Sequence, residues 1–237
     1  MIRGFTIIEA LLTIAIVSVL IALTLPRFAE FRYQANYAVA LARLGQHSAV
    51  ITMYTSDHRS FFPYLSDPDN PFKNPIPWSG GLIRTHYFGV FNCWNVALAD
   101  MYYGGRAGDP SFESPFRPAA LRGSLYTDYF YANVYLARPE FWTTYSRIGP
   151  SQWAPTRAEE VVFPARKSLL VFGPDGIFNV DFNRWTGALA FVDGSASRTP
   201  KVLRGHPEGE GTWPGCLNVG ELVAMHTLEG VRGVDVP

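Results

Sequence analysis

The sequence predicts an α+β protein, in which one long N-terminal helix precedes a head built around an antiparallel β-sheet. The first observation is an uncharged apolar run near the N-terminus, after which apolar residues recur every three or four positions as far as Tyr54. The second is a C-terminal third made of short apolar segments separated by glycine, proline and aspartate, a pattern typical of strands joined by turns. No second apolar run reaches membrane length.

The apolar run predicts a transmembrane helix. From Phe5 to Leu25 the only ionisable side chain is that of Glu9. A helix rises about 1.5 Å per residue, so this stretch spans roughly 31 Å, about one bilayer core. A charged residue at the centre of a membrane helix costs on the order of 2.5 to 3.5 kcal/mol, and the smaller cost near the helix end still demands a partner for Glu9.

Beyond Pro26 the helix is predicted to continue to about Ser56 as an amphipathic helix. Its polar positions include Arg32 and Arg43. Asp57 begins a polar stretch that ends the pattern, and Pro63 opposes continuation of the helix. The predicted apolar face consists of Tyr33, Tyr37, Leu41, Leu44, Ser48, Ile51 and Tyr54.

The rest of the chain is long enough for one globular domain with its own core. Residues 61–81 are rich in Pro, Gly, Asn and Asp and are predicted to form a loop region. A short helix is expected at 96–103, a helical turn at 157–161, and either a strand or a core helix at 126–136. Strands are predicted at 168–172, 177–182, 185–192 and 196–203, with turns at 173–176 and at Asp193-Gly194.

Composition and motifs argue against an enzyme and against nucleic-acid binding. The chain has 20 basic and 20 acidic residues, and no basic patch stands out. Its five histidines lack metal-ligand spacing, and the sequence contains no G-x-S-x-G, H-E-x-x-H or phosphate-binding glycine loop. No cofactor is expected. Loop carboxylates at Asp67 and Asp69, or at Asp175 and Asp181, are either solvated or ligands of calcium, which prefers oxygen.

Cys93 and Cys216 are the only cysteines. In an oxidising compartment they could form one disulfide, which would close a long loop and join the middle of the head to its C-terminal segment. Two buried free thiols are the alternative.

The residues Gly4-Phe5-Thr6-Ile7-Ile8-Glu9, followed by an uncharged helix with Pro26 at its far end, resemble the type IV prepilin family. That family includes type IV pilins and the pseudopilins of type II secretion systems. The resemblance implies cleavage after Gly4 by prepilin peptidase and N-methylation of the new N-terminus at Phe5. It also implies that Glu9 pairs with the terminal amine of an adjacent subunit, and that Pro26 kinks the helix.

The same resemblance implies a domain organisation and a location. Residues 1–4 would be the leader peptide, 5–26 the transmembrane and filament-core helix, 27–58 its amphipathic continuation, and 59–237 a periplasmic or extracellular head. The chain would cross the inner membrane once with a cytoplasmic N-terminus, in line with Arg3, and then enter a filament. Its partners would be prepilin peptidase, other pilin-like subunits, the inner-membrane assembly platform and the membrane itself.

Two further stretches of the sequence indicate which subgroup of the type IV prepilin family the chain resembles. The segment from Asp57 to Pro63 resembles the helix exit of major pseudopilins, which bind calcium in their heads. Residues 188–196 resemble the second half of the H-x9-D-G box found in a large group of prepilin-like proteins. Asp193-Gly194 matches this box, whereas Asn183 stands where the histidine would be. Asp193-Gly194 is also predicted to form a tight hairpin turn.

Alternative interpretations remain at this level. An ordinary signal peptide does not explain the length of the apolar run, and a plain signal anchor explains neither Gly4 nor Glu9. The function most strongly indicated is that of a structural subunit of a type II pseudopilus or a type IV pilus. The alternative is a filament-tip or membrane-tethered binding module, whose aromatic-rich segment contains Tyr87, Phe88, Phe91, Trp94, Tyr102 and Tyr103.

Overall fold

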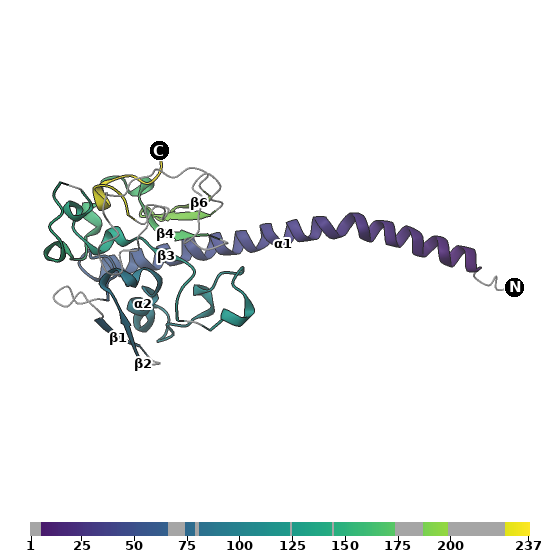
Figure 1. The fold of residues 1–237 in the computed structure, drawn as a ribbon, viewed down its shortest axis with the longest axis horizontal. Coiled ribbons are helices and arrows are strands. Elements are labelled where there is room, and N and C mark those ends of the chain that lie inside the picture. Colours follow the sequence, from purple (N-terminus) through teal and green to yellow (C-terminus); the bar gives the residue numbers. More distant parts are fainter. Residues whose placement is uncertain are drawn as a thin grey trace. The chain divides into compact units, whose positions relative to one another are not determined.

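The computed structural model describes residues 6–65, 74–78, 81–123, 125–143, 145–173, 187–198 and 226–237. The chain forms two compact units, residues 1–39 and residues 40–237, and the division falls inside the long helix α1 (Ile7–Asp57) (Figure 1). The first unit consists of the N-terminal part of α1. The second contains the last turns of α1 together with all the strands.

The predicted helix is confirmed, with its C-terminal end one residue beyond the expected position. Leu44, Ser48 and Ile51, all on the predicted apolar face, are fully buried. The helix ends where Arg59 and Ser60 adopt left-handed backbone angles, φ 54° and 66°, and the Ser60 N–H donates to the Thr55 carbonyl at 2.8 Å. The amphipathic pattern therefore predicted correctly which side of the helix packs in the second unit.

A four-stranded antiparallel sheet is the larger of two β-sheets in the described part of the head. Its strands follow one another in sequence order: β3 (Phe130–Tyr131), β4 (Ser168–Phe172), β5 (Ala188–Phe191) and β6 (Ala196–Arg198). All residues of β4 and β5 are buried. The Ser48 hydroxyl of α1 donates to the Phe191 carbonyl of β5 at 3.1 Å, so this part of the helix packs directly on the sheet.

The hairpin between β5 and β6 contains the predicted Asp193-Gly194 turn. Gly194 has φ +86°, a conformation that glycine adopts without strain. The Asp193 carboxylate accepts hydrogen bonds from the Ser195 N–H at 2.9 Å and the Ser195 hydroxyl at 2.6 Å. The turn is thus confirmed. Asn183 and the predicted strand at 177–182 lie outside the described residues.

One expectation was wrong. The stretch 61–81, predicted to be a loop region, contributes β1 (Asn74–Trp78), which pairs with β2 (Gly81–Thr85) in a separate two-stranded antiparallel ribbon (Figure 1). Pro75 and Pro77 suggested a loop because proline cannot donate a backbone hydrogen bond. The two prolines are two residues apart and so share one edge of their strand, which leaves the alternate residues free to pair with β2.

The middle of the head is built mainly from short helices. The predicted helix at 96–103 is α2 (Asn95–Tyr102), and the expected turn near 157–161 is the 3₁₀ helix Ala158–Glu160. The open alternative at 126–136 resolves into strand β3 followed by the 3₁₀ helix Asn133–Leu136. Fully buried aromatic side chains fill the space between these elements, among them Trp94, Trp142, Tyr87, Tyr129, Phe88 and Phe141.

Candidate functional site

The first described turn of the chain contains a reciprocal cap made by Thr6 and Glu9. The Glu9 Oε2 atom accepts hydrogen bonds from the Thr6 N–H and the Thr6 hydroxyl, both at 2.8 Å. In return, the Thr6 Oγ1 atom accepts the Glu9 N–H at 3.3 Å. This is a capping box, in which two side chains satisfy backbone donors that the start of a helix leaves unpaired.

The pattern Thr-x-x-Glu is a known sequence signature of a capping box. The sequence analysis did not predict this cap. Glu9 was interpreted only as a residue that pairs with the terminal amine of an adjacent subunit. The structure provides a local partner through Oε2, and Glu9 nevertheless remains an exposed side chain. The carboxylate therefore caps its own helix through Oε2.

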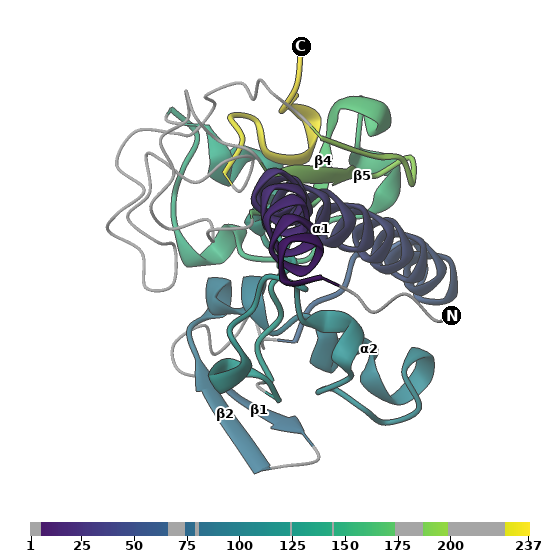
Figure 2. The same ribbon diagram turned by 90° about the vertical axis from the view of Figure 1, so that its right-hand side faces the viewer.

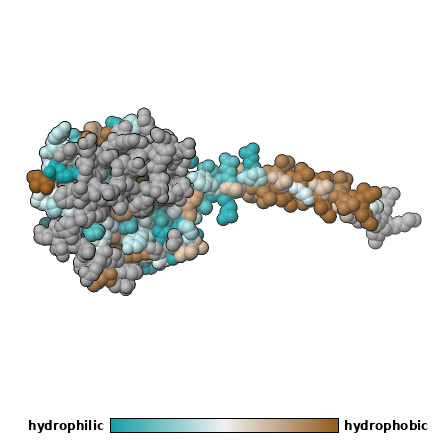
Figure 3. All heavy atoms as spheres, viewed as in Figure 1, coloured by the Kyte–Doolittle hydropathy of each residue, from teal (hydrophilic) through white to brown (hydrophobic). Residues whose placement is uncertain are grey.

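The helix that follows is apolar on every side. Its most hydrophobic 18-residue window has a mean hydropathy of 2.5, and none of that window is buried. Figure 3 shows this part of α1 as a continuous hydrophobic surface, followed along the helix by polar residues. The helix is long and apolar enough to cross a membrane. An exposed surface of this kind needs a lipid or protein environment to cover it.

Each hydroxyl within the apolar stretch is satisfied inside the helix. Thr13 donates to the Glu9 carbonyl at 2.7 Å, Ser18 to the Ile14 carbonyl at 2.7 Å, and Thr24 to the Leu20 carbonyl at 2.9 Å. Such bonds remove the cost of placing a hydroxyl in an apolar medium. Pro26 lies inside α1, which continues through it to Asp57.

The remaining predicted site residues are placed only in part. Gly4, Phe5 and Cys216 lie outside the described residues, as do Asp67, Asp69, Asp175 and Asp181. Cys93 is buried, and burial raises the pKa of its thiol to about 12. Its Sγ atom lies 3.6 Å from the Gly89 carbonyl oxygen. The disulfide with Cys216 stays a prediction.

The aromatic-rich segment belongs largely to the core. Tyr87, Phe88, Phe91 and Trp94 are buried, and the Trp94 indole N–H donates to the Tyr129 carbonyl at 2.7 Å. The other two members, Tyr102 and Tyr103, are half-buried and each bonds to a side chain of α1: Tyr102 to Asp57 at 2.6 Å and Tyr103 to His47 at 2.7 Å. These side chains support the head internally.

His47 is a buried polar residue on the helix face that packs in the head. Its Nε2 atom lies 2.9 Å from the Ser111 carbonyl oxygen, and its Nδ1 atom lies 2.7 Å from the Tyr103 hydroxyl. Because a carbonyl only accepts, Nε2 carries the proton and Nδ1 accepts from the tyrosine. The ring also stacks on Phe112, with centroids 4.9 Å apart. Burial lowers the pKa of His47 to about 4, so the imidazole is neutral at pH 7.

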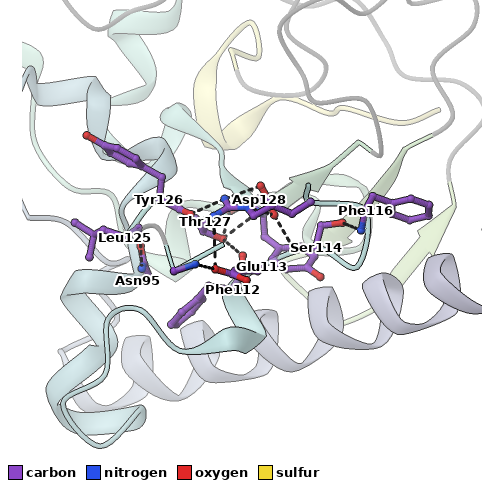
Figure 4. A network of polar contacts seen from close by, with 12 residues as sticks. Asn95, Phe112, Glu113, Ser114, Phe116, Leu125, Tyr126, Thr127 and Asp128 are labelled. Carbon is purple, nitrogen blue, oxygen red and sulfur yellow. Dashed lines mark hydrogen bonds and ion pairs between the residues drawn. The ribbon is translucent and has the colours of Figure 1, made fainter. Parts of the chain in front are cut away.

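A polar network near α1 organises the loop between residues 109 and 128 (Figure 4). Arg117 forms a bidentate pair with Asp128, with Nε–Oδ2 and Nη2–Oδ1 distances of 2.7 Å each. Asp128 also accepts the Ser114 N–H at 2.6 Å. Arg43 of α1 donates to the Glu113 carbonyl at 2.5 Å. These contacts stabilise the fold of the head, since each charged group in them binds a partner within the head.

The described residues contain no cluster of three or more His, Cys, Asp or Glu side chains that could hold a metal ion. A surface groove of about 600 Å³ opens beside the 3₁₀ helix Pro139–Trp142. Its charged lining residues are Arg138, Arg232, Glu140 and Glu160. Because two guanidinium groups face two carboxylates, the groove does not favour a ligand of either charge.

Comparisons of the chain with models of protein families, with curated protein sequences and with solved structures give no match. The chemistry of the described residues therefore carries the functional argument. The most unusual feature of the described residues is the apolar N-terminal part of α1, which carries the Glu9 carboxylate in its first turn.

Proposed function

We propose that this protein is a filament subunit of the type IV prepilin class, cleaved between Gly4 and Phe5 and polymerised through its N-terminal helix. One observation carries the proposal: the apolar part of α1 is fully exposed, and its only ionisable side chain, Glu9, sits in the first turn. A membrane anchor needs only the apolar surface, and a carboxylate at a membrane helix is costly even where it caps its own helix.

Assembly would use both features. Removal of residues 1–4 creates an α-amino group on Phe5, and in the filament core this amine would neutralise the Glu9 carboxylate of a neighbouring subunit. The Thr6 cap occupies Oε2 of Glu9, so Oε1 is the oxygen offered to the incoming amine. Burial of the exposed apolar surface of α1 against neighbouring helices would supply most of the cohesion.

The proposed location and partners follow from this mechanism. The apolar helix holds the subunit in the inner membrane with its head exported, until an assembly platform extracts it into a filament. Prepilin peptidase, other pilin-like subunits and that platform are the proposed partners. The sequence at the end of α1, from Asp57 to Pro63, supports a pseudopilus subunit, and a type IV pilus subunit is the alternative within this proposal.

The binding-module alternative has less support. It depended on six aromatic residues, four of which are buried in the core. The other two are half-buried and hydrogen-bonded to side chains of α1. A ligand would reach the four buried rings only after local rearrangement of the head.

Mass spectrometry of the mature N-terminal peptide from native membranes tests the proposal. A peptide that begins at N-methylated Phe5 is expected. An intact Met1 start would replace the proposal with a plain membrane-anchored protein. A start beyond Pro26 would mean that the helix is removed, and the filament mechanism would then be wrong.

A further inference from the structure

Lys167 and Asp235 form a buried pair that joins the sheet to the C-terminal segment. Lys167 directly precedes β4, and Asp235 belongs to the segment 226–237 that lies beside that strand (Figure 2). The two side chains are 0% and 2% exposed. Two hydrogen bonds from neighbouring groups hold them together: the Asp235 N–H donates to the Arg166 carbonyl at 3.0 Å, and the Arg166 side-chain Nε donates to the Val236 carbonyl at 3.0 Å.

The amine faces the carboxyl group almost symmetrically. Lys167 Nζ lies 3.2 Å from Oδ2 and 3.4 Å from Oδ1 of Asp235. A nitrogen nearly equidistant from both oxygens also faces the carbon that joins them. In a near-attack arrangement the reacting atoms, here Nζ and the carboxyl carbon, lie about 3 to 3.5 Å apart, and the contacts of Nζ with both oxygens hold the amine beside that carbon.

Burial favours the neutral form of the Lys167 amine. Desolvation lowers the pKa of Lys167, even though the Asp235 carboxylate opposes the shift. A buried ion pair loses the hydration of both charges, and moving one proton from Nζ to the carboxylate removes both charges at once. The products of that transfer are a neutral amine, which is nucleophilic, and a carboxylic acid, which an amine can attack.

Neighbouring groups are arranged to assist such an attack. Asp235 Oδ2 accepts the Ser168 N–H at 2.8 Å and the Ser168 hydroxyl at 2.7 Å, two donors that would stabilise negative charge on this oxygen. The Thr227 hydroxyl accepts a hydrogen bond from Lys167 Nζ and donates one to Asp235 Oδ1. It therefore links the nitrogen that must lose a proton to the oxygen that must leave.

We propose that Lys167 and Asp235 join in an intramolecular isopeptide bond. Lys167 Nζ attacks the side-chain carboxyl carbon of Asp235, and the carbon–Oδ1 bond breaks. A proton from Nζ passes through the Thr227 hydroxyl to Oδ1, which leaves with both its protons as one molecule of water. The reaction needs no oxidant or co-reactant. Its product fastens the C-terminal segment covalently to the sheet.

The test is made on the full-length protein, purified in detergent, reduced and alkylated. The intact mass is expected to fall below the mass calculated for the alkylated sequence by one water molecule. Trypsin should then yield residues 167–184 linked to residues 233–237, because an acylated Lys167 is not cleaved. A chain at the full mass calculated for the alkylated sequence, with residues 168–184 and 233–237 recovered as separate peptides, would overturn the proposal and leave a buried ion pair.

Two variants identify the atoms involved. Asp235→Asn should react with loss of ammonia, and its product would have the same mass as the reacted native chain because the amide formed is identical. Lys167→Arg keeps the positive charge but should retain its full mass. Water loss that persists in Lys167→Arg would overturn the assignment, since the Asp-Gly pairs at 175–176 and 193–194 can also lose water by cyclising.

Discussion

The Glu9 carboxylate accepts two hydrogen bonds from Thr6, one from the backbone N–H and one from the hydroxyl, each 2.8 Å long. This relationship gives Glu9 a role in a single subunit as well as the proposed role between subunits. The local role needs only a hydrogen-bond acceptor, whereas pairing with a neighbour's amine needs a negative charge. The two roles can therefore be separated by substitution.

Glu9→Gln tests the charge while keeping the cap, because glutamine also completes a capping box. Cleavage and membrane insertion should be unchanged, and filament yield should fall strongly. The reason is that an amine left unpaired in an apolar core costs about 3 to 5 kcal/mol. The measurement is sheared-filament yield by immunoblot, compared with the N-terminal peptide mass.

Thr6→Ala is the matched control for this prediction. It removes the hydroxyl of the cap and keeps the charge of Glu9, so the helix start should lose about 1 kcal/mol and filaments should still form. If Glu9→Gln assembles normally while Thr6→Ala does not, the carboxylate acts by capping and the proposed pairing with Phe5 is wrong.

Local patterns in the sequence predicted the elements that depend on neighbouring residues. The apolar periodicity from Tyr37 to Tyr54 predicted the buried face of α1 because helix geometry alone places these residues on one side. Asp193-Gly194 predicted its turn because glycine tolerates the observed φ of +86°. The Thr6–Glu9 cap was equally readable from the sequence, but the interpretation of Glu9 as an intersubunit residue obscured it.

Contacts between distant residues could not be predicted in this way. Lys167 and Asp235 are separated by 68 positions, and no spacing rule connects them. His47 was placed only among scattered histidines, since its partners Tyr103 and Ser111 come from other segments. The β1–β2 ribbon was missed because strand pairing depends on which edge the prolines occupy, and composition does not reveal that.

Substitutions two residues apart on α1 should separate packing from exposure. Ile51 is fully buried, and Ile51→Ala should lower the free energy of unfolding of the head by about 2 to 5 kcal/mol through lost contacts and a cavity. Met53 is 55% exposed, and Met53→Ala should change the free energy of unfolding by less than about 0.5 kcal/mol. Urea unfolding of the detergent-purified protein, followed by tryptophan fluorescence, measures both. Equal effects would contradict the observed face of the helix.

Gly194 should resist replacement for conformational reasons alone. No atom lies within 4 Å of the position that a Cβ would occupy, so Gly194→Ala meets no clash, but its φ of +86° should cost about 1 to 2 kcal/mol. Gly108→Ala has equal space and no positive φ, and should be close to neutral. The difference between the urea midpoints of the two variants measures the cost of placing alanine at the positive φ of position 194. A neutral Gly194→Ala would mean that the turn adopts another conformation.

His47 should make the head sensitive to acid. Its pKa is about 4 in the folded protein and near 6.5 when exposed, so the folded state binds fewer protons between these values. The contribution of His47 to the free energy of unfolding is therefore fully present above about pH 6.5. It is lost as the pH falls towards 4, by up to about 3 kcal/mol. Unfolding midpoints measured at intervals across this range give the slope.

His47→Gln removes the titration while keeping hydrogen-bonding groups at the position. This variant should be less stable than the native protein at pH 7, because the Tyr103 and Ser111 contacts and the stack on Phe112 are disturbed. Its stability should nevertheless change less between pH 6.5 and 4. His58→Gln, on a half-buried histidine just past the end of α1, is the control and should keep the native slope. A buried neutral imidazole gains a proton when acid unfolds the head around it, so a native slope in His47→Gln would mean that the acid sensitivity comes from other titrating groups.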